Sequence, residues 1–198
     1  RFYDFENFGM IDAASAFIEQ GRIQFFCVDS IDEETWSNEG GNPRERIELH
    51  ERWYHYIVDE FVLRVQEIST FDNGGKSYDK MMTCGCSMGA FHALNTMLRR
   101  PDVFDKVLAM SGIYHASFFF HEYHDELTYQ NSPSDYLANL KEDHPYMELY
   151  RQSEVILCCG QGAWEQECEN SLHHMEQIYA DKQIDVWIDF WGYDVSHD

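Results

Sequence analysis

Short apolar runs that alternate with helical segments constrain this fold more than any other feature of the sequence. The runs are KMMTCGC (80–86), KVLAMSG (106–112), EVILCC (154–159) and DVWIDF (185–190). Strands that are apolar along their whole length are typical of parallel sheets, because helices cover the faces of such sheets. The alternation therefore predicts an α/β domain with a mostly parallel sheet and helices on both faces.

Segments with helical periodicity stand between and before these runs. They cover residues 88–98, the stretch from Trp164 to Ile178 and, earlier in the chain, the stretch from Leu49 to Ile68. In the earliest of these, apolar residues recur every three or four positions, which predicts a long amphipathic helix. The polar loop before it ends at Pro43. Proline is favoured at the first position of a helix, so Pro43 predicts where a helix begins.

Two further segments need a separate interpretation. Near the start, helical spacing from Ile11 to Ile18 is followed by RIQFFCV (22–28), whose aromatic and β-branched residues predict a further strand. Residues 113–150 mix aromatic residues with His, Asp and Ser-Pro, which predicts an insertion of short helices that covers a functional site like a lid. No repeat or linker divides the chain, so we interpret residues 1–198 as one domain.

The charge of the chain excludes two classes of partner. The formal net charge is −22 at pH 7, from 36 acidic and 14 basic residues. Such a surface repels nucleic acid and anionic lipid, so we expect neither a nucleic-acid nor a membrane partner. No apolar run reaches the ~20 residues of a membrane span, and no signal-peptide pattern is present. The oligomeric state stays open.

The cysteines point to a reducing environment. Most of them lie in apolar runs, where a free thiol behaves as a small hydrophobic side chain. This usage predicts a cytoplasmic location. Neither Cys84 and Cys86 nor Cys158 and Cys159 have the two-residue spacer of a zinc or redox pair. We therefore expect no metal and no cofactor.

The sequence Gly85-Cys86-Ser87-Met88-Gly89 fits the motif G-x-S-x-G and lies between a predicted strand and a predicted helix. In that position the motif indicates a nucleophile elbow, a sharp turn whose glycines leave room beside the serine. We predict that Ser87 is a nucleophile. The backbone N–H of Met88, at the start of the helix, is the predicted oxyanion donor. The alternative interpretation is an ordinary tight turn.

A serine nucleophile needs a base and an acid, in the order serine, acid, histidine along the chain. His197 follows the last predicted strand and fits the base. The acid should follow residues 154–159, where the loop GQGAWEQE contains Glu165 but no aspartate. We predict Glu165, although a carboxylate near a helix start is also explained by the helix dipole. Other carboxylates remain open as the acid: Glu167, Asp194 and Asp198.

The stretches GCSMGAFHALN, KVLAMSGIY, RQSEVILCCGQGAWE and DFWGYDVSHD resemble the esterase family of α/β-hydrolases that includes esterase D and feruloyl-esterase-like enzymes. The resemblance covers most of the chain. It implies an α/β-hydrolase fold and a serine carboxylic-ester hydrolase with Ser87 as nucleophile and His197 as base. In the family, the acid is usually an aspartate close to the position of Ala163. This chain has no aspartate in that loop.

The resemblance also has implications for the domain. Family members have strands before the first helix and a helix after the histidine, so the resemblance implies a partial domain that lacks both. It places the second oxyanion amide close to Phe2.

From these observations we expect a serine esterase that cleaves a small-molecule carboxylic ester through an acyl-enzyme intermediate. Two alternatives remain open. One is a catalytically silent binding protein with the α/β-hydrolase fold, which the missing aspartate favours and the intact serine, glycines and histidine oppose. The other is an acyltransferase on the same scaffold.

Overall fold

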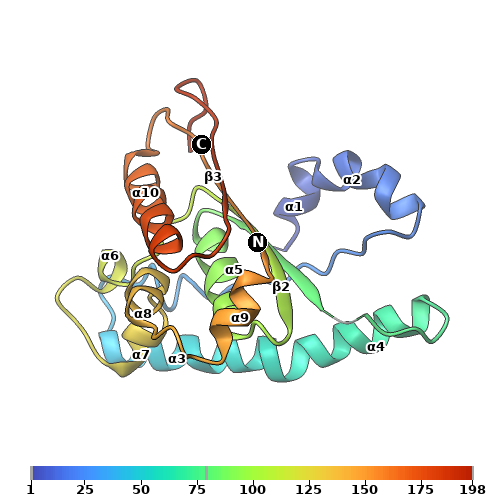
Figure 1. The fold of residues 1–198 in the computed structure, drawn as a ribbon, viewed down its shortest axis with the longest axis horizontal. Helices are drawn as coiled ribbons and strands as arrows, with labels where there is room; N and C mark the ends of the chain where they lie inside the picture. Colours follow the sequence, from blue (N-terminus) through green and yellow to red (C-terminus); the bar gives the residue numbers. More distant parts are fainter. Residues whose placement is uncertain (1, 79, 198) are drawn as a thin grey trace. The chain divides into compact units, whose positions relative to one another are not determined.

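The computed structural model describes residues 2–78 and 80–197, which fall into two units, one within residues 1–78 and one within residues 79–198. The first unit is helical. Its elements are α1 (Asp4–Asn7), α2 (Met10–Glu19), α3 (Pro43–His55), the π-helix η1 (Tyr56–Phe61) and α4 (Val62–Asp72) (Figure 1). The predicted helix from Leu49 to Ile68 is confirmed as helical throughout, with a π-helical segment in its middle.

The start of α3 follows from local chemistry. Pro43 is the first helical residue, as predicted, and Asn42 is the N-cap. The Asn42 side-chain oxygen accepts hydrogen bonds from the backbone N–H groups of Arg44 (3.0 Å) and Glu45 (3.2 Å). These bonds satisfy donors that the helix itself leaves unpaired.

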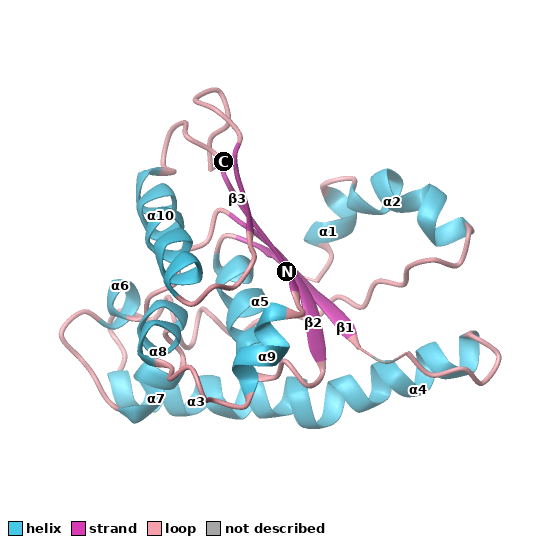
Figure 2. Cartoon of the chain, viewed as in Figure 1, coloured by secondary structure: helices cyan, strands magenta, loops and turns pink. Residues whose placement is uncertain are grey.

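The prediction of a strand at residues 22–28 is wrong. The chain forms an irregular loop there (Figure 2). Cys27 and Val28 are exposed. A strand requires a neighbour that pairs with its N–H and C=O groups, and β propensity supplies none. Within the described residues, every strand belongs to the sheet of the second unit.

The second unit is built on a parallel sheet. Its strands are β1 (Met81–Cys86), β2 (Phe104–Met110), β3 (Glu154–Cys159) and β4 (Trp187–Phe190), paired in that order. The predicted strands at 80–86, 106–112, 154–159 and 185–190 are thus confirmed, with ends that agree to within two residues.

Helices connect successive strands of this sheet. α5 (Met88–Arg99) lies between β1 and β2, and α10 (Gln166–Asp181) between β3 and β4. The connection between β2 and β3 carries α6 (Ser117–Phe120), α7 (Glu126–Gln130), α8 (Pro133–Asn139) and α9 (Tyr146–Arg151), as expected for the insertion. One detail of the prediction is wrong: Trp164 lies before α10, because its φ of 67° is incompatible with a right-handed helix.

The core of this unit lies between the sheet and the helices. α5 packs on β1 and β2, and α10 packs on β3. Every residue of α5 from Ala90 to Leu98 is buried. The side chains of Val107 and Leu157 in the central strands are buried as well. This packing fixes where the helices begin, and α5 and α10 begin at the carboxyl edge of the sheet.

The carboxyl ends of the strands bring distant residues together. Ser87 directly follows β1, Ser111 directly follows β2, and Gly160 directly follows β3. The backbone N–H of Ser87 donates to the carbonyl of Met110, and that of Ser111 to the carbonyl of Cys158, each at 2.8 Å. The sheet ladder thus extends to both serines and holds them at neighbouring positions.

No helix within residues 2–78 and 80–197 combines the length and apolar character needed to cross a membrane.

Candidate active site

Ser87 lies on a strained turn between β1 and α5. Its backbone has φ 55° and ψ −121°, a conformation that costs a non-glycine residue about 1–3 kcal/mol. A Cβ atom at Gly85 would lie 2.1 Å from the carbonyl oxygen of Gly89, so only glycine fits there. A Cβ atom at Gly89 would meet no atom within 4 Å. The expectation that the turn has no room for a β-carbon at either glycine is therefore confirmed for Gly85 and wrong for Gly89.

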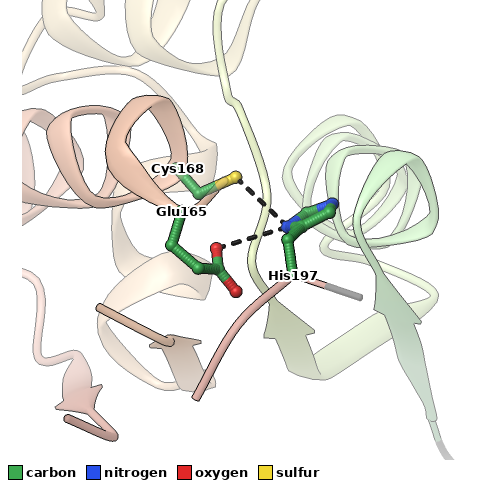
Figure 3. Close-up of side chains that lie close together, drawn as sticks. All are labelled: Glu165, Cys168 and His197. Atoms are coloured by element: carbon green, nitrogen blue, oxygen red, sulfur yellow. Dashed lines mark hydrogen bonds and ion pairs between the residues drawn. The ribbon is translucent and has the colours of Figure 1, made fainter. Parts of the chain in front are cut away.

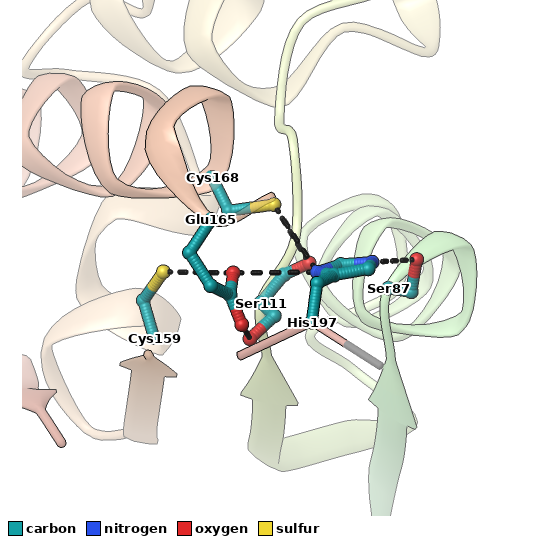
Figure 4. Close-up of polar contacts among 6 residues, drawn as sticks. All are labelled: Ser87, Ser111, Cys159, Glu165, Cys168 and His197. Carbon is teal, nitrogen blue, oxygen red and sulfur yellow. Dashed lines mark hydrogen bonds and ion pairs between the residues drawn. The ribbon is translucent and has the colours of Figure 1, made fainter. Parts of the chain in front are cut away.

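His197 lies beside Ser87 although the two are 110 positions apart in the chain. The Ser87 hydroxyl oxygen and the His197 Nε2 atom are 2.8 Å apart (Figure 4). The backbone N–H of His197 donates to the carbonyl of Ala163 at 3.1 Å. The loop after β4 is thereby bonded to the loop after β3.

Glycines allow these two loops to touch through their backbones. The N–H of Gly162 donates to the carbonyl of Val195 at 2.8 Å. Cβ atoms at Gly160 and Gly162 would lie 2.3 Å and 2.6 Å from that same carbonyl oxygen. A larger residue at either position would push the two loops apart and would displace His197, which lies in the loop after β4.

Glu165 approaches the other side of the histidine ring. Its Oε2 atom is 3.3 Å from His197 Nδ1, slightly beyond the 2.6–3.2 Å typical of a hydrogen bond. The Glu165 residue is 1% exposed and forms the N-cap position of α10. Of the alternative acids, Glu167 and Asp194 are exposed, and Asp198 lies outside the described residues.

Two further side chains hold the Glu165 carboxylate. The hydroxyl of Ser111 donates to Oε1 at 2.7 Å, and the thiol of Cys159 donates to Oε2 at 3.4 Å (Figure 4). Burial by itself raises the pKa of Glu165, but the hydrogen bonds from Ser111, His197 and Cys159 outweigh it, and the net pKa is lowered. Glu165 is therefore an ionised carboxylate at neutral pH.

Sequence reasoning missed Ser111, Cys159 and Cys168. A signal for Ser111 was present, because polar residues directly after neighbouring parallel strands meet at one edge of the sheet. Ser111 follows β2 as Ser87 follows β1. For Cys168 the signal was its spacing from Glu165, since residues three positions apart lie on one face of a helix.

Cys168 lies against the histidine from the first turn of α10. Its sulfur is 3.8 Å from His197 Nδ1, and its thiol donates to the carbonyl of Ser111 at 3.2 Å. Burial and, after it, the neighbouring Glu165 carboxylate raise the pKa of Cys168 to about 12. The thiol is therefore neutral at physiological pH.

A cavity of about 270 Å³ opens onto Ser87 and His197. Its lining residues are Ser87, Met88, Ser111, Ile113, Phe118, Phe119, Trp164, Glu167, Cys168 and His197. The insertion supplies the apolar wall through Ile113, Phe118 and Phe119, whereas Phe120 is 3% exposed and belongs to the core. A carbonyl compound in this cavity would lie next to the serine hydroxyl.

The two predicted oxyanion donors differ in their placement. Met88 is the first residue of α5 and lines the cavity. The N–H groups of the first helical turn have no partner within the helix, so that of Met88 is available to an oxyanion. Phe2 lies in the first unit, where its N–H donates to the Asp29 carboxylate at 2.6 Å. Its role stays a prediction.

The parallel sheet, with a serine on the turn from strand to helix at its carboxyl edge, defines the fold as that of an α/β-hydrolase. Residues 6–191 match the family model described as "Putative esterase". The chain therefore belongs to that esterase family, as the sequence motifs predicted. No curated protein sequence matches it.

Solved structures show the same fold. A ferulic acid esterase is similar with a TM-score of 0.53 and 18% identity, over 75% of this chain and 54% of that one. An S-formylglutathione hydrolase from Agrobacterium tumefaciens is similar with a TM-score of 0.52 and 14% identity, over 73% of this chain and 50% of that one. The matched part of this chain thus corresponds to about half the length of these structures.

Proposed function

We propose that this chain carries the catalytic centre of a serine esterase, which cleaves carboxylic esters through an acyl-enzyme intermediate. One observation carries the proposal: His197 contacts the Ser87 hydroxyl through Nε2 at 2.8 Å and the Glu165 carboxylate through Nδ1 at 3.3 Å. This is the arrangement of nucleophile, base and acid in a serine hydrolase. Membership of the esterase family supports an ester as the substrate.

The first half of the proposed reaction forms the acyl-enzyme. The oxygen of Ser87 attacks the ester carbonyl carbon while Nε2 of His197 takes the hydroxyl proton. The negative charge on the former carbonyl oxygen is stabilised by the N–H of Met88. The tetrahedral intermediate collapses, the carbon–oxygen ester bond breaks, and the leaving alkoxide takes the proton from His197.

The second half returns the free enzyme. Water attacks the acyl group on Ser87 and gives a proton to Nε2 of His197. Collapse of this second intermediate releases the carboxylic acid, and the serine oxygen recovers its proton from the ring. In both halves the Glu165 carboxylate accepts the Nδ1–H of His197 and stabilises the imidazolium that forms.

Glutamate can fill the place of the family's aspartate for a geometric reason. Its side chain is one methylene longer, and Glu165 lies two positions beyond Ala163 in the loop. Glu165 occupies the N-cap position of α10, and the extra methylene lets its carboxylate reach His197 Nδ1 from that position. Ser111 fixes the second carboxylate oxygen at 2.7 Å, which limits the rotamers of the longer side chain.

The cavity favours a small substrate with an apolar portion. A volume of about 270 Å³ is slightly below the usual range for ligand pockets. Phe118 and Phe119 from α6 line one part of it, and Trp164, which is 79% exposed, lines another. We propose that these aromatic side chains contact the acyl or the alcohol group of the ester.

The proposal is tested by the hydrolysis of p-nitrophenyl acetate by the wild type, by Ser87→Ala and by Ser117→Ala. We expect Ser87→Ala to lower turnover by a factor on the order of 10⁶ while leaving the fold intact. Ser117 is an exposed serine of α6 that is absent from the cavity lining, so its variant should retain the wild-type rate.

Two outcomes would contradict the proposal. More than about a tenth of the wild-type rate in Ser87→Ala would show that Ser87 is not the nucleophile. A folded wild type that hydrolyses no activated ester would favour a silent binding protein. If activity is present, adding an alcohol as acceptor and quantifying the new ester separates acyl transfer from hydrolysis.

A further inference from the structure

Three potential metal-binding atoms converge beside the histidine ring. Glu165 Oε2, Cys168 Sγ and His197 Nδ1 lie within 4.8 Å of one another (Figure 3). Glu165 and Cys168 are buried, and both come from the start of α10. A carboxylate oxygen, a thiolate sulfur and an imidazole nitrogen are the three donor types that zinc binds in proteins.

Two of the three separations between these atoms match those around a tetrahedral ion. With zinc bonds of ~2.3 Å to sulfur and ~2.0–2.2 Å to nitrogen and oxygen, a tetrahedral angle sets sulfur and nitrogen ~3.6 Å apart and nitrogen and oxygen ~3.4 Å apart. The corresponding separations here are 3.8 Å for Sγ to Nδ1 and 3.3 Å for Nδ1 to Oε2. These two separations are within a few tenths of an ångström of the tetrahedral values, and the third pair, a Glu165 carboxylate oxygen and Cys168 Sγ, lies within 4.8 Å.

We propose that Glu165, Cys168 and His197 form a binding site for a zinc-class divalent cation, and that occupancy of this site inactivates the Ser87–His197 pair. The effect on activity rests on the proposed esterase function, whereas the binding itself does not. The site is inhibitory because the ion binds Nδ1 of His197, the atom through which Glu165 otherwise orients the ring.

The proton balance explains the inhibition. Binding replaces the thiol proton of Cys168 with the metal, and that one proton is released to solvent. The neutral imidazole binds the ion through its Nδ1 lone pair, so the ring proton moves to Nε2 with no net change in the ring. Nε2, 2.8 Å from the Ser87 oxygen, is then a hydrogen-bond donor and cannot accept the serine proton.

The cavity supplies a route for the ion. Cys168 and His197 both line it, together with the exposed carboxylate of Glu167. The net charge of −22 raises the local concentration of cations at the surface. Three protein donors leave a fourth tetrahedral position, which a water molecule can fill on the cavity side.

Binding can be measured without any assay of activity. Cobalt(II) is a spectroscopic substitute for zinc, and a cobalt–thiolate bond produces a charge-transfer absorption band. We expect this band with the wild type and with Cys27→Ser, which removes an exposed thiol of the first unit. We expect it to be absent with Cys168→Ser. A wild type without the band, or a Cys168→Ser variant that retains it, would overturn the site.

Inhibition is measured in parallel, with zinc held at defined free concentrations by a chelator. Cys168→Ser should raise the zinc concentration for half-inhibition at least about tenfold relative to its own metal-free rate, since loss of even an outer partner of a metal ligand costs about 10–100-fold. Cys27→Ser should be inhibited like the wild type. Equal sensitivity of Cys168→Ser and the wild type would contradict the proposal.

The two measurements separate the two proposals. A thiolate band without any esterase activity would uphold the metal site and reject the proposed function. Esterase activity that zinc does not affect, without the band, would uphold the function and reject the metal site. If Cys168→Ser does not fold, the wild-type cobalt spectrum still decides whether a thiolate ligand is present.

Discussion

At the scale of single residues, the Glu165 carboxylate connects the three strand ends of the site. One oxygen accepts from Ser111 after β2, and the other contacts His197 after β4 and Cys159 at the end of β3. These contacts keep a buried carboxylate ionised, because they outweigh the cost of its burial. A buried carboxylate with a lowered pKa beside a histidine is typical of a functional site.

Replacing Glu165 by glutamine tests its proposed role. The amide keeps the shape of the side chain but loses the charge that stabilises the imidazolium. We expect turnover to fall about 10²–10⁴-fold in Glu165→Gln, with serine reactivity lost in proportion. Asp194→Asn, which neutralises an exposed carboxylate of the loop before His197, should change turnover little. A larger loss in Asp194→Asn than in Glu165→Gln would reverse the assignment.

The same carboxylate should leave a signature in the dependence of stability on pH. Because its pKa in the folded state lies below the ordinary 4.5, the unfolded chain takes up the proton first as the pH falls. The stabilisation from ionised Glu165 is therefore complete above about pH 4.5 and is lost as the pH falls through the folded-state pKa. The difference in free energy of unfolding between wild type and Glu165→Gln, from urea titrations, should shrink over that range. A difference that grows toward acid pH would have the wrong sign.

Residue-level chemistry was partly predictable from the sequence. The contact between Ser87 and His197 could be predicted, because a local motif and the order of residues along the chain single them out. The positions of Ser111 and Cys168 carried a signal, since one directly follows a strand and the other is three residues after Glu165. Which atoms they contact could not be predicted, since those contacts depend on which strands are neighbours and in which register.

At the scale of elements, the turn between β1 and α5 depends on one glycine rather than two. A side chain at position 85 would collide with the carbonyl of Gly89, whereas position 89 faces open space. The two glycines of the motif therefore have different physical roles. Gly85 permits the close approach of strand and helix, and Gly89 imposes no such requirement in this structure.

This difference is tested by comparing the stability of the single variants Gly85→Ala and Gly89→Ala. We expect Gly85→Ala to lower the free energy of unfolding by about 1–3 kcal/mol or more, as for other overpacked sites. Gly89→Ala should be neutral or stabilising by about 0.5–1 kcal/mol, because alanine is favoured over glycine in a helix. Thermal melts of both variants decide the matter. Equal destabilisation would show that the close approach of Gly85 to the Gly89 carbonyl is not what limits the turn.

The three consecutive phenylalanines of α6 have two different roles, since two of them line the cavity and the third packs in the core. Phe118 and Phe119 line the cavity, and Phe120 is buried in the core. We expect Phe118→Ala with Phe119→Ala to change the ranking of p-nitrophenyl esters of different acyl length. We expect Phe120→Ala instead to cost about 3–5 kcal/mol of stability with an unchanged ranking. An unchanged ranking in the double variant would show that α6 does not contact the substrate.

The elements themselves show where sequence patterns suffice. The strands of the second unit were predictable because each is largely apolar and because helical segments alternate with them along the chain. Residues 22–28 have a similar composition but form no strand. The difference lies in pairing, because a strand exists only where a neighbour completes its hydrogen bonds, and composition cannot report that neighbour.

At the scale of the whole molecule, the second unit contains Ser87, His197 and Glu165, and also the cavity that Ser87 and His197 line. The family assignment covers residues 6–191 and so includes most of both units. Two predictions concern both units and stay predictions: the chain is one domain, and Phe2 supplies a second oxyanion donor. The central claim, a reactive serine on the elbow, can be tested on the chain as it is.

The most direct test is covalent labelling with a fluorophosphonate, read by intact-mass spectrometry and peptide mapping. Such probes react with a serine only when a neighbouring base activates it. We predict a single adduct on the folded wild type, located at Ser87, and no adduct on folded Ser87→Ala. A folded wild type that stays unlabelled, or a Ser87→Ala variant that still acquires the label, would contradict the account.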